Sequence, residues 1–369
     1  MHKDFLPTHG GQLRELSAEF GMPEASLVDF SASIHPQPLS DLVIETLCSA
    51  LRGRKILTEY PDMHYTALKE AITSYADAGL SSITVGSGVM PLLSAAVSAF
   101  RPHKCLVPVP AFGEYCKVLE TCGVDFCTLE LTPDNDFLLD CARVLAALKS
   151  SGAQALLLAN PQSPSGKLTE AKQLFELYKS AHAVGATVIV DEAFIDYAPE
   201  ESLSQWAAKL PGLVVLRSLT KFFAMPGLRV AYAIACSDTS NAMESCVPAW
   251  PAGSIAAEAA RMVLLDQTSI AATREANAIE RSWLESQLQS LGLRVFPSTA
   301  NYLLVKIDQG RSGLEFWRRL IVEHRVVVRS CANFEGLDEY YFRIGVRTRS
   351  QNQVLVRAFK EVLQFTSHI

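Results

Sequence analysis

One segment of the chain combines a primary amine with two hydroxyl groups directly after an apolar run: Ser218-Leu219-Thr220-Lys221, followed eight residues later by Arg229. A lysine at the end of a buried strand can form a Schiff base once burial and nearby positive charge lower its pKa. The hydroxyl groups and the guanidinium suit a phosphate, which an arginine can bind through two parallel hydrogen bonds. A lone lysine is usually a surface residue, but this grouping favours a role in catalysis.

Two further groups lie after apolar runs. Asp191 follows Thr187-Val188-Ile189-Val190, and a carboxylate there would keep a pyridine nitrogen protonated, which makes such a ring an electron sink. Gly86-Ser87-Gly88 opens a predicted helix, whose N–H groups offer a site for a phosphate dianion. Taken singly, the aspartate is equally typical of a cap or a metal ligand, and the glycines of a tight turn.

The elements that must position these groups are short apolar segments alternating with amphipathic helices, from about residue 50 to residue 240. Continuous hydrophobicity is typical of parallel strands buried on both faces, and ligands bind beyond the carboxyl ends of such strands. Helices are predicted over Val89–Phe100 and over Thr169–Val184, which Thr169 can cap. The predicted strands are Ser82–Gly86, Lys104–Val109, Ala155–Ala159, Thr187–Asp191 and Leu213–Leu216.

The pattern changes after about residue 240. A long helix is predicted from Ser254 to about Leu291, then strands and helices of a smaller α+β domain. These are the strands Asn301–Ile307, Arg325–Arg329 and Tyr340–Gly345, and the helices Gly313–His324 and Gln351–Phe365. The expected division is an N-terminal arm with part of the small domain (1–49), a large cofactor-binding domain (50–245), and a connecting helix with the C-terminal small domain (246–369).

Composition excludes several classes of function. The net charge is −6 and no block of lysine and arginine occurs, so neither nucleic acid nor a membrane surface is an expected partner. The nine cysteines form no C-x-x-C pair, which favours reduced thiols and no metal site. The chain has no apolar stretch of the roughly 18–20 residues that a membrane helix needs and no apolar N-terminal region, so we expect a cytoplasmic protein.

The sequence resembles the fold type I, aspartate-aminotransferase-like superfamily of pyridoxal-phosphate enzymes. The motifs that carry the resemblance, in chain order, are Gly86-Ser87-Gly88, Asn160-Pro161-x-x-Pro164-x-Gly166, Asp191-Glu192-Ala193, Ser218-x-x-Lys221 and Arg229. The resemblance implies an α/β fold, with a mostly parallel sheet wrapped by helices and a smaller α+β domain. It also implies pyridoxal 5'-phosphate as the cofactor, held as a Schiff base by Lys221, with Asp191 under the ring nitrogen.

The resemblance also assigns the remaining contacts with the cofactor. Asn160 would bond the ring hydroxyl and Phe112 would stack on the ring, whereas Phe194 stands where many relatives have a tyrosine that bonds the same hydroxyl. Tyr60 would reach the cofactor phosphate of a neighbouring subunit, which implies a homodimer with shared active sites. The phosphate itself would be held by Gly88, the backbone N–H groups of Val89 and Met90, Ser218, Thr220 and Arg229.

Within this superfamily, the chain looks most similar to the threonine-phosphate decarboxylase family of cobalamin biosynthesis, itself similar to histidinol-phosphate aminotransferases. The segments that carry this second resemblance are His9-Gly10-Gly11, Asp29-Phe30-Ser31-Ala32, Arg217–Phe222, Asn301–Leu304, Val328–Asn333, Gly336-Leu337-Asp338 and Tyr341–Ile344. It implies decarboxylation of O-phospho-L-threonine or a close analogue such as O-phosphoserine. The alternative is a pyridoxal-phosphate-dependent aminotransferase of the histidinol-phosphate type. A non-catalytic binding protein of the same fold is disfavoured, because Lys221, Asp191, Asn160 and Arg229 are all retained.

By the same resemblance, Arg343 would bind the substrate α-carboxylate, while Arg329 and His9 would meet the substrate phosphate. Ser33, Ile34 and Asn160 would complete the substrate contacts. The chain departs from the decarboxylase pattern near the substrate, and these departures leave open both the exact substrate and the choice between decarboxylation and transamination. The departing positions include Ser33, His35, Val89, Met90 and Gly253.

Overall fold

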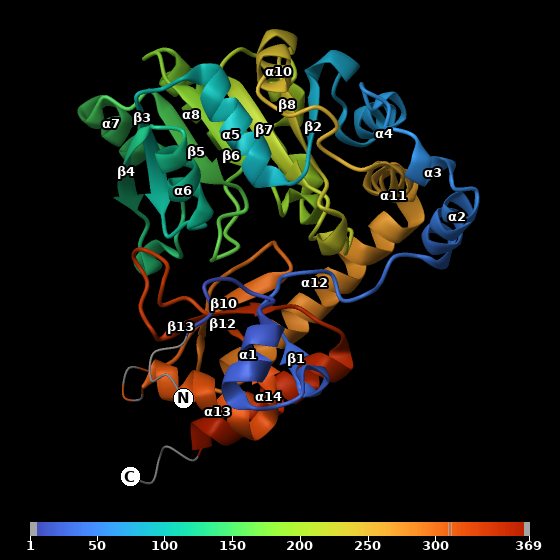
Figure 1. Cartoon of the computed structure of the whole chain (residues 1–369). Helices are drawn as coiled ribbons and strands as arrows, with labels where there is room; N and C mark the ends of the chain where they lie inside the picture. The colour runs from blue at the N-terminus through green and yellow to red at the C-terminus, as the bar shows by residue number, and fades with distance from the viewer. Residues whose placement is uncertain (1–5, 309, 311, 365–369) are drawn as a thin grey trace.

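A seven-stranded sheet forms the centre of the larger part of the molecule (Figure 1). The structure is a computed structural model and describes residues 6–308, 310 and 312–364. The strand order is β2-β8-β7-β6-β5-β3-β4; β8 pairs antiparallel with both neighbours, and the other four pairings are parallel. The strands are β2 (Ile83–Gly86), β3 (Lys104–Val109), β4 (Asp125–Glu130), β5 (Ala155–Ala159), β6 (Thr187–Asp191), β7 (Leu213–Ser218) and β8 (Ala231–Ala235).

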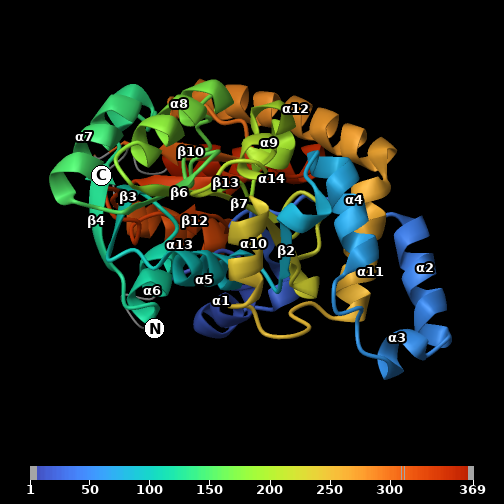
Figure 2. The same ribbon diagram turned by 90° about the horizontal axis from the view of Figure 1, so that it is seen from above.

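Helices cover both faces of this sheet, as the view from above shows (Figure 2). One face packs against α5 (Val89–Phe100), α6 (Glu114–Thr121) and α10 (Ser237–Glu244). The other packs against α4 (Thr66–Ala76), α7 (Cys141–Ser151), α8 (Ala171–His182), α9 (Ser204–Ala207) and α11 (Ser254–Leu265). Alternate strand residues enter the two cores: Val188 and Val190 pack on the α8 side and Ile189 on the α5 side. The predicted mostly parallel, helix-wrapped sheet is therefore confirmed.

Thr169 does not cap α8, contrary to the prediction. Its backbone N–H donates to Asn160 Oδ1, and its carbonyl accepts from Asn160 Nδ2. These two bonds hold Thr169 outside the helix, and Glu170 is the N-cap residue instead, without a side-chain capping bond.

The smaller part of the molecule is built on a four-stranded antiparallel sheet of order β12-β13-β10-β9. Its strands are β9 (Arg294–Val295), β10 (Tyr302–Lys306), β12 (Arg329–Ser330) and β13 (Tyr341–Gly345). The helices α1 (Leu13–Phe20), α13 (Gly313–His324) and α14 (Arg349–Gln364) pack around a core that includes Phe30, Trp317 and Phe359. A parallel pair, β1 (Val28–Asp29) with β11 (Val326–Val327), brings the N-terminal segment into this part.

Two predicted elements of the C-terminal half are divided in the structure. The predicted long helix is α11 followed by α12 (Gln267–Ser290), because Asp266 interrupts it and its side chain accepts from the Ser269 N–H to cap α12. The predicted strand Arg325–Arg329 becomes β11 and β12, which pair in different sheets. Phe365, the predicted end of the last helix, lies outside the described residues.

The remaining helices are α2 (Asp41–Arg52) and α3 (Lys55–Thr58), at one side of the larger part (Figure 1). No helix within the described ranges is sufficiently long and apolar to span a membrane.

Candidate active site

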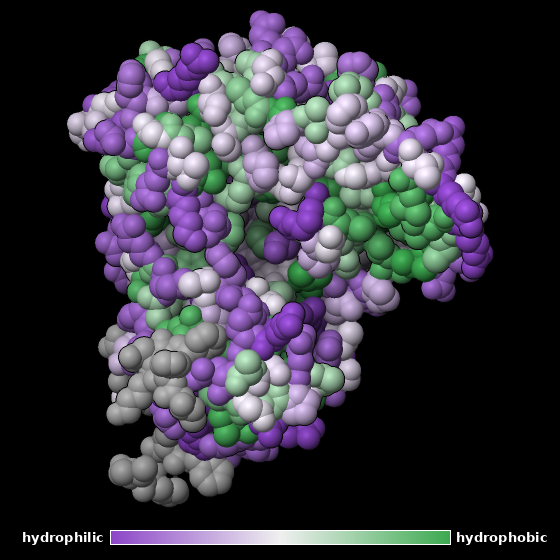
Figure 3. Space-filling view, in the orientation of Figure 1, coloured by the Kyte–Doolittle hydropathy of each residue, from purple (hydrophilic) through white to green (hydrophobic). Residues whose placement is uncertain are grey.

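A cavity of about 910 Å³ lies where the carboxyl ends of β6 and β7 face the smaller sheet. Figure 3 shows the surface hollowed near the middle of this face. Most of the site residues predicted from the sequence line the cavity: His9, Ser33, Ile34, Gly88, Val89, Met90, Phe112, Asp191, Phe194, Ser218, Thr220, Lys221, Arg229, Arg329 and Arg343. The structure thus gathers residues from both parts of the molecule, and only Asn160 and Tyr60 of the predicted set do not line this cavity.

Lys221 follows β7, whose six residues are all buried, so the strand delivers the amine directly to the cavity. Burial, together with the positive charges of Arg343 and Arg229, lowers the pKa of Lys221 to about 8, although the Asp191 carboxylate opposes this shift. The Lys221 carbonyl accepts a hydrogen bond of 3.0 Å from the His35 N–H, which fastens the loop to the N-terminal segment. Near neutral pH, a useful fraction of the amine is therefore unprotonated and nucleophilic.

Asp191, at the end of β6, is only 7% exposed. Its Oδ2 accepts from the Tyr115 hydroxyl at 2.6 Å, and its Oδ1 accepts from the Ala193 N–H at 2.9 Å. Burial still raises the pKa of Asp191, although both bonds and Lys221 oppose the shift. Because burial disfavours the ionised form of this carboxylate, a cation bound beside it would stabilise that form. A protonated pyridine nitrogen is such a cation. Tyr115 was not among the site residues predicted from the sequence.

Groups that suit a phosphate also line the cavity. The Ser218 and Thr220 hydroxyl oxygens are 2.8 Å apart, and no carboxylate of the described residues lies within 4.0 Å of the Arg229 guanidinium. Gly88 is the N-cap residue of α5 and makes no side-chain capping bond, so the first N–H groups of the helix point at the cavity without a cap. Gly88 has φ +123°, and a Cβ there would lie 2.9 Å from Arg229 Nη2, so glycine is required for this close approach.

Two phenylalanine rings, Phe112 and Phe194, also line the cavity. The Phe112 ring lies 5.9 Å from the Tyr115 ring and 5.8 Å from the His9 ring. The Phe194 ring meets the Tyr302 ring edge-on at 4.9 Å. An aromatic heterocycle with a phosphate arm and a basic nitrogen fits this arrangement of apolar rings, carboxylate and phosphate-binding groups.

Asn160 and Tyr60 are placed differently from the other predicted residues. Asn160 is 1% exposed, and its amide nitrogen and oxygen are bonded to Thr169 at 3.0 and 2.9 Å. The second hydrogen on Asn160 Nδ2 remains available to donate a hydrogen bond to a cofactor. Tyr60 is 77% exposed and stacks on Trp250 with the ring centroids 4.4 Å apart, so its hydroxyl does not reach the cavity of its own chain.

The smaller sheet contributes two arginines that lie directly opposite each other, Arg329 on β12 and Arg343 on β13. The groups nearest Arg343 are Ser163 Oγ and the Ser31 carbonyl, both at 3.5 Å, and its Nε has no hydrogen-bond partner in the described structure. Within the described ranges, no carboxylate lies within 4.0 Å of either guanidinium. Like charges placed opposite one another are destabilising, so the pair is suited to bound anions.

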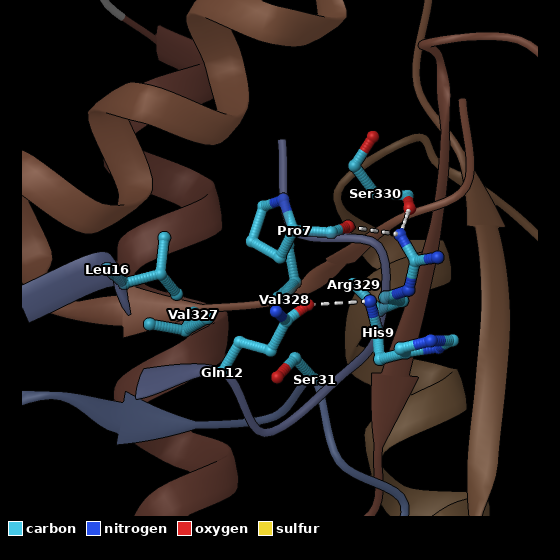
Figure 4. A pocket seen from close by; sticks show the side chains of 9 residues that line it. All are labelled: Pro7, His9, Gln12, Leu16, Ser31, Val327, Val328, Arg329 and Ser330. Carbon is cyan, nitrogen blue, oxygen red and sulfur yellow. Dashed lines mark hydrogen bonds between the residues drawn. The ribbon is translucent and has the colours of Figure 1, made fainter. Parts of the chain in front are cut away.

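Arg329 is also bonded to the N-terminal segment. Its guanidinium donates to the carbonyls of Pro7 and Ser330 (Figure 4), to the Thr8 carbonyl and to Asn333 Oδ1. Burial lowers the pKa of Arg329 to about 10, so the side chain stays charged at neutral pH.

Around these arginines lie the other predicted substrate contacts. His9 Nε2 lies 3.2 Å from Glu114 Oε1, and Glu114 is also paired with Lys117 at 2.6 Å. The Ser33 hydroxyl is buried and has no partner among the described residues, so it is free to meet a ligand. Burial and the charge of Arg347 lower the pKa of His35 to about 4, so that imidazole is neutral at pH 7.

A buried ionic network behind the cavity fixes the strand ends. The Arg217 guanidinium is bonded to Asp196 and lies 3.5 Å from Glu192 Oε2. Glu192 follows Asp191 and Arg217 precedes Ser218, so the network joins the ends of β6 and β7 just behind two groups of the site. Burial raises the pKa of Glu192 to about 7 despite the nearby guanidinium.

Comparisons with known proteins agree with this geometry. The family model of aminotransferase class I and II matches residues 26–359. The chain belongs to this family. Membership confirms the predicted fold and the predicted cofactor, pyridoxal 5'-phosphate.

Three relatives illustrate the range of the family. Threonine-phosphate decarboxylase of Salmonella typhimurium is 33% identical, with 97% of each chain covered. The adenosylcobalamin biosynthesis bifunctional protein CobDQ of Leptospira interrogans is 28% identical over 98% of this chain and 42% of its own length. The histidinol-phosphate aminotransferase structure from Clostridium acetobutylicum superposes with a TM-score of 0.84 at 26% identity, covering 92% of this chain and 100% of its own.

Proposed function

We propose that this protein decarboxylates O-phospho-L-threonine, or a close analogue such as O-phosphoserine, to the aminoalkyl phosphate in cobalamin biosynthesis. The observation that carries the proposal is the pair Arg329 and Arg343, two guanidinium groups that face one cavity and lack carboxylate partners within the described ranges. A phosphorylated amino acid brings one carboxylate and one phosphate, which match two such groups. The similarity to the Salmonella decarboxylase supports the same assignment.

The residues of the cavity divide into those that would hold the cofactor and those that would hold the substrate. Ser218, Thr220, Arg229 and the first N–H groups of α5 would bind the cofactor phosphate, and Asp191 would bond the ring nitrogen. The bound cofactor supplies an electron sink for the bond that breaks at the substrate α-carbon. Lys221 would bind the cofactor and afterwards return a proton to that carbon, for which its lowered pKa is suited.

The substrate would lie between the cofactor and the smaller sheet. Arg343, with its unpaired Nε, would bind the α-carboxylate, while Arg329 and His9 would bind the phosphate. The carboxylate would thus be oriented by a residue of one sheet while Lys221 approaches from the other.

A second candidate function is amino transfer of the histidinol-phosphate type. The superposition on the Clostridium acetobutylicum aminotransferase supports it, and the same lysine, aspartate and arginines would serve. In that reaction, Lys221 would remove the α-proton instead of returning one after loss of the carboxylate.

The experiment that separates the two functions is a panel of phosphorylated amino acids supplied to the purified holoenzyme. We expect release of carbon dioxide from O-phospho-L-threonine, with weaker release from O-phosphoserine, and no dependence on a keto acid. Amino transfer from histidinol phosphate to 2-oxoglutarate without carbon dioxide release would establish the aminotransferase instead.

We also infer that the protein is a homodimer that shares its active sites. A group of large apolar residues is exposed on α2, α3 and the adjoining segment, where the hydropathy view shows a continuous apolar area (Figure 3). Its members are Leu42, Ile44, Leu51, Leu57, Tyr60 and Met63. Single protomers rarely expose apolar areas of this kind unless a partner covers them. A second copy is the proposed partner, because Tyr60 belongs to the patch and does not reach its own cavity.

The dimer predicts a specific effect of charge in this patch. Leu42 and Leu57 are 68% and 60% exposed, so Leu42→Glu combined with Leu57→Glu should leave the protomer folded. Buried and unpaired carboxylates cost several kcal/mol in an interface, so sedimentation should show monomers with little activity. Val184→Glu, at a residue that is 48% exposed beyond the end of α8, is the matched control. A wild-type protein that is active as a monomer would contradict the inference.

A further inference from the structure

The hydroxyl of Tyr115 has no place in the function proposed above, yet it is bonded to the central carboxylate of the site. Tyr115 lies in the first turn of α6 and is 1% exposed. Its hydroxyl lies 2.6 Å from Asp191 Oδ2, a distance typical of a hydroxyl that donates to an ionised carboxylate. The Tyr115 hydroxyl is therefore committed to Asp191.

The surroundings hold this hydroxyl in place. The Tyr115 N–H donates to the Phe112 carbonyl at 3.0 Å, and the two rings meet edge-on at 5.9 Å. The second carboxylate oxygen of Asp191 accepts from the Ala193 N–H. Each oxygen thus receives one fixed donor, which sets the plane and direction of the carboxylate.

Among the residues that the structure describes, few other charged or titratable groups act on Asp191. Lys221 is the cation that favours its ionised form, and the Tyr302 hydroxyl lies near both Asp191 and Tyr115. Burial and the Asp191 charge raise the pKa of Tyr115 well above its usual value, so the phenol is protonated and is a donor near neutral pH.

We propose that Tyr115 is a positioning residue whose hydroxyl keeps Asp191 ionised and aimed at the cofactor ring nitrogen, and thereby keeps the proton on that nitrogen. The inference rests on the proposed role of Asp191. A donor to a carboxylate stabilises the charged form over the neutral one. Without the donor, Asp191 becomes the stronger base and draws the shared proton away from the ring. Tyr115 would act through Asp191 and need not touch the substrate.

A purely structural role for Tyr115 makes a different prediction. If the ring only fills space beside Phe112, then removing the hydroxyl should leave the ring nitrogen unchanged. Tyr115→Phe removes only the hydroxyl and keeps the ring. Tyr178→Phe is the matched control, because Tyr178 is also a buried tyrosine and its hydroxyl bonds the Pro211 carbonyl at 2.8 Å, away from the cavity.

The test uses pyridoxal 5'-phosphate labelled with ¹⁵N, bound to each variant, and follows the nitrogen chemical shift against pH. In Tyr115→Phe, the nitrogen shift near neutral pH should move toward the position of the unprotonated ring, because more of the proton shared with Asp191 then lies on the carboxylate; losing one hydrogen bond to a charged group should change this distribution by about tenfold. Apoprotein titrated with the cofactor should bind it roughly tenfold more weakly. Tyr178→Phe should match the wild type in both measurements.

Asp191→Asn, measured in parallel, separates the inference about Tyr115 from the proposed role of Asp191. If Asp191→Asn strips the ring nitrogen of its proton and Tyr115→Phe shifts nothing, Asp191 keeps its role and the inference about Tyr115 is wrong. If Asp191→Asn leaves the nitrogen unchanged, the proposed role of Asp191 itself fails. A fluorinated tyrosine at position 115 covers the case in which Tyr115→Phe does not fold. It is a stronger donor and should hold the shared proton on the ring nitrogen, so a nitrogen shift displaced toward the unprotonated position would again overturn the inference.

Discussion

Replacing Lys221 by alanine should abolish covalent attachment of the cofactor and lower turnover at least about a thousandfold, within the range that a positioned acid–base group contributes. Lys221 is the lysine that follows β7 into the cavity, with Asp191 and Arg229 beside it. The wild-type protein should be yellow, and borohydride reduction followed by peptide mapping should place the label on Lys221. Lys179→Ala, at an exposed lysine paired with Glu176 on α8, is the control and should keep colour and activity. Label on any other lysine would refute the assignment.

The same variant should also change how stability depends on pH. Lys221 has a pKa of about 8 in the folded apoprotein, against 10.5 for an ordinary lysine. Between these values the unfolded chain binds more protons, so this group makes the folded apoprotein more stable as pH rises from 8 to 10.5. Below pH 8, the cost of keeping a charged amine in the cavity is fully present. Subtracting the urea-unfolding free energies of Lys221→Ala from those of wild type at each pH isolates this rise. A pH-independent difference would show that the amine is not desolvated.

Much of the large sheet follows from the sequence because its strands are continuously apolar. The strands Lys104–Val109, Ala155–Ala159 and Thr187–Asp191 have the predicted bounds. A short, continuously apolar segment of this kind is typical of a parallel strand that is buried on both faces. Asp191 ends β6 and Lys221 follows β7, so the parallel pairing of these two strands brings both residues to the same edge of the sheet. Their convergence therefore follows from two apolar strands that the sequence predicts.

Other features depend on contacts that local sequence does not encode. The edge strand β4 carries Asp125, Thr128 and Glu130 among its apolar residues, so it lacks the continuous apolar pattern and was not predicted. Tyr115 was missed because its partner, Asp191, is 76 residues away along the chain. The apolar periodicity continues past Asp266, but the capping bond to Ser269 is favourable enough to divide the helix there.

The pair Arg329 and Arg343 predicts a strong preference for a phosphorylated substrate. Wild-type enzyme should use O-phospho-L-threonine at least about a hundredfold better than threonine, because a buried guanidinium left without its anion costs about 3–5 kcal/mol. Arg329→Ala should remove most of that preference by lowering kcat/KM for the phosphorylated substrate. Arg343→Ala, one strand away on the same sheet, should lower kcat/KM for both substrates alike, since both carry the α-carboxylate.

The contacts of Arg329 with Pro7 and Thr8 give this experiment a second purpose. If Arg329 serves only to hold the N-terminal segment against the smaller sheet, Arg329→Ala should loosen His9 and impair both substrates equally. A selective loss for phosphothreonine therefore requires contact with the phosphate itself, in addition to those carbonyls. Equal use of threonine and phosphothreonine by the wild type would rule out a phosphorylated substrate. In that case, the two opposed guanidinium groups would need a different dianion, because their mutual repulsion in a buried cavity persists until anions bind.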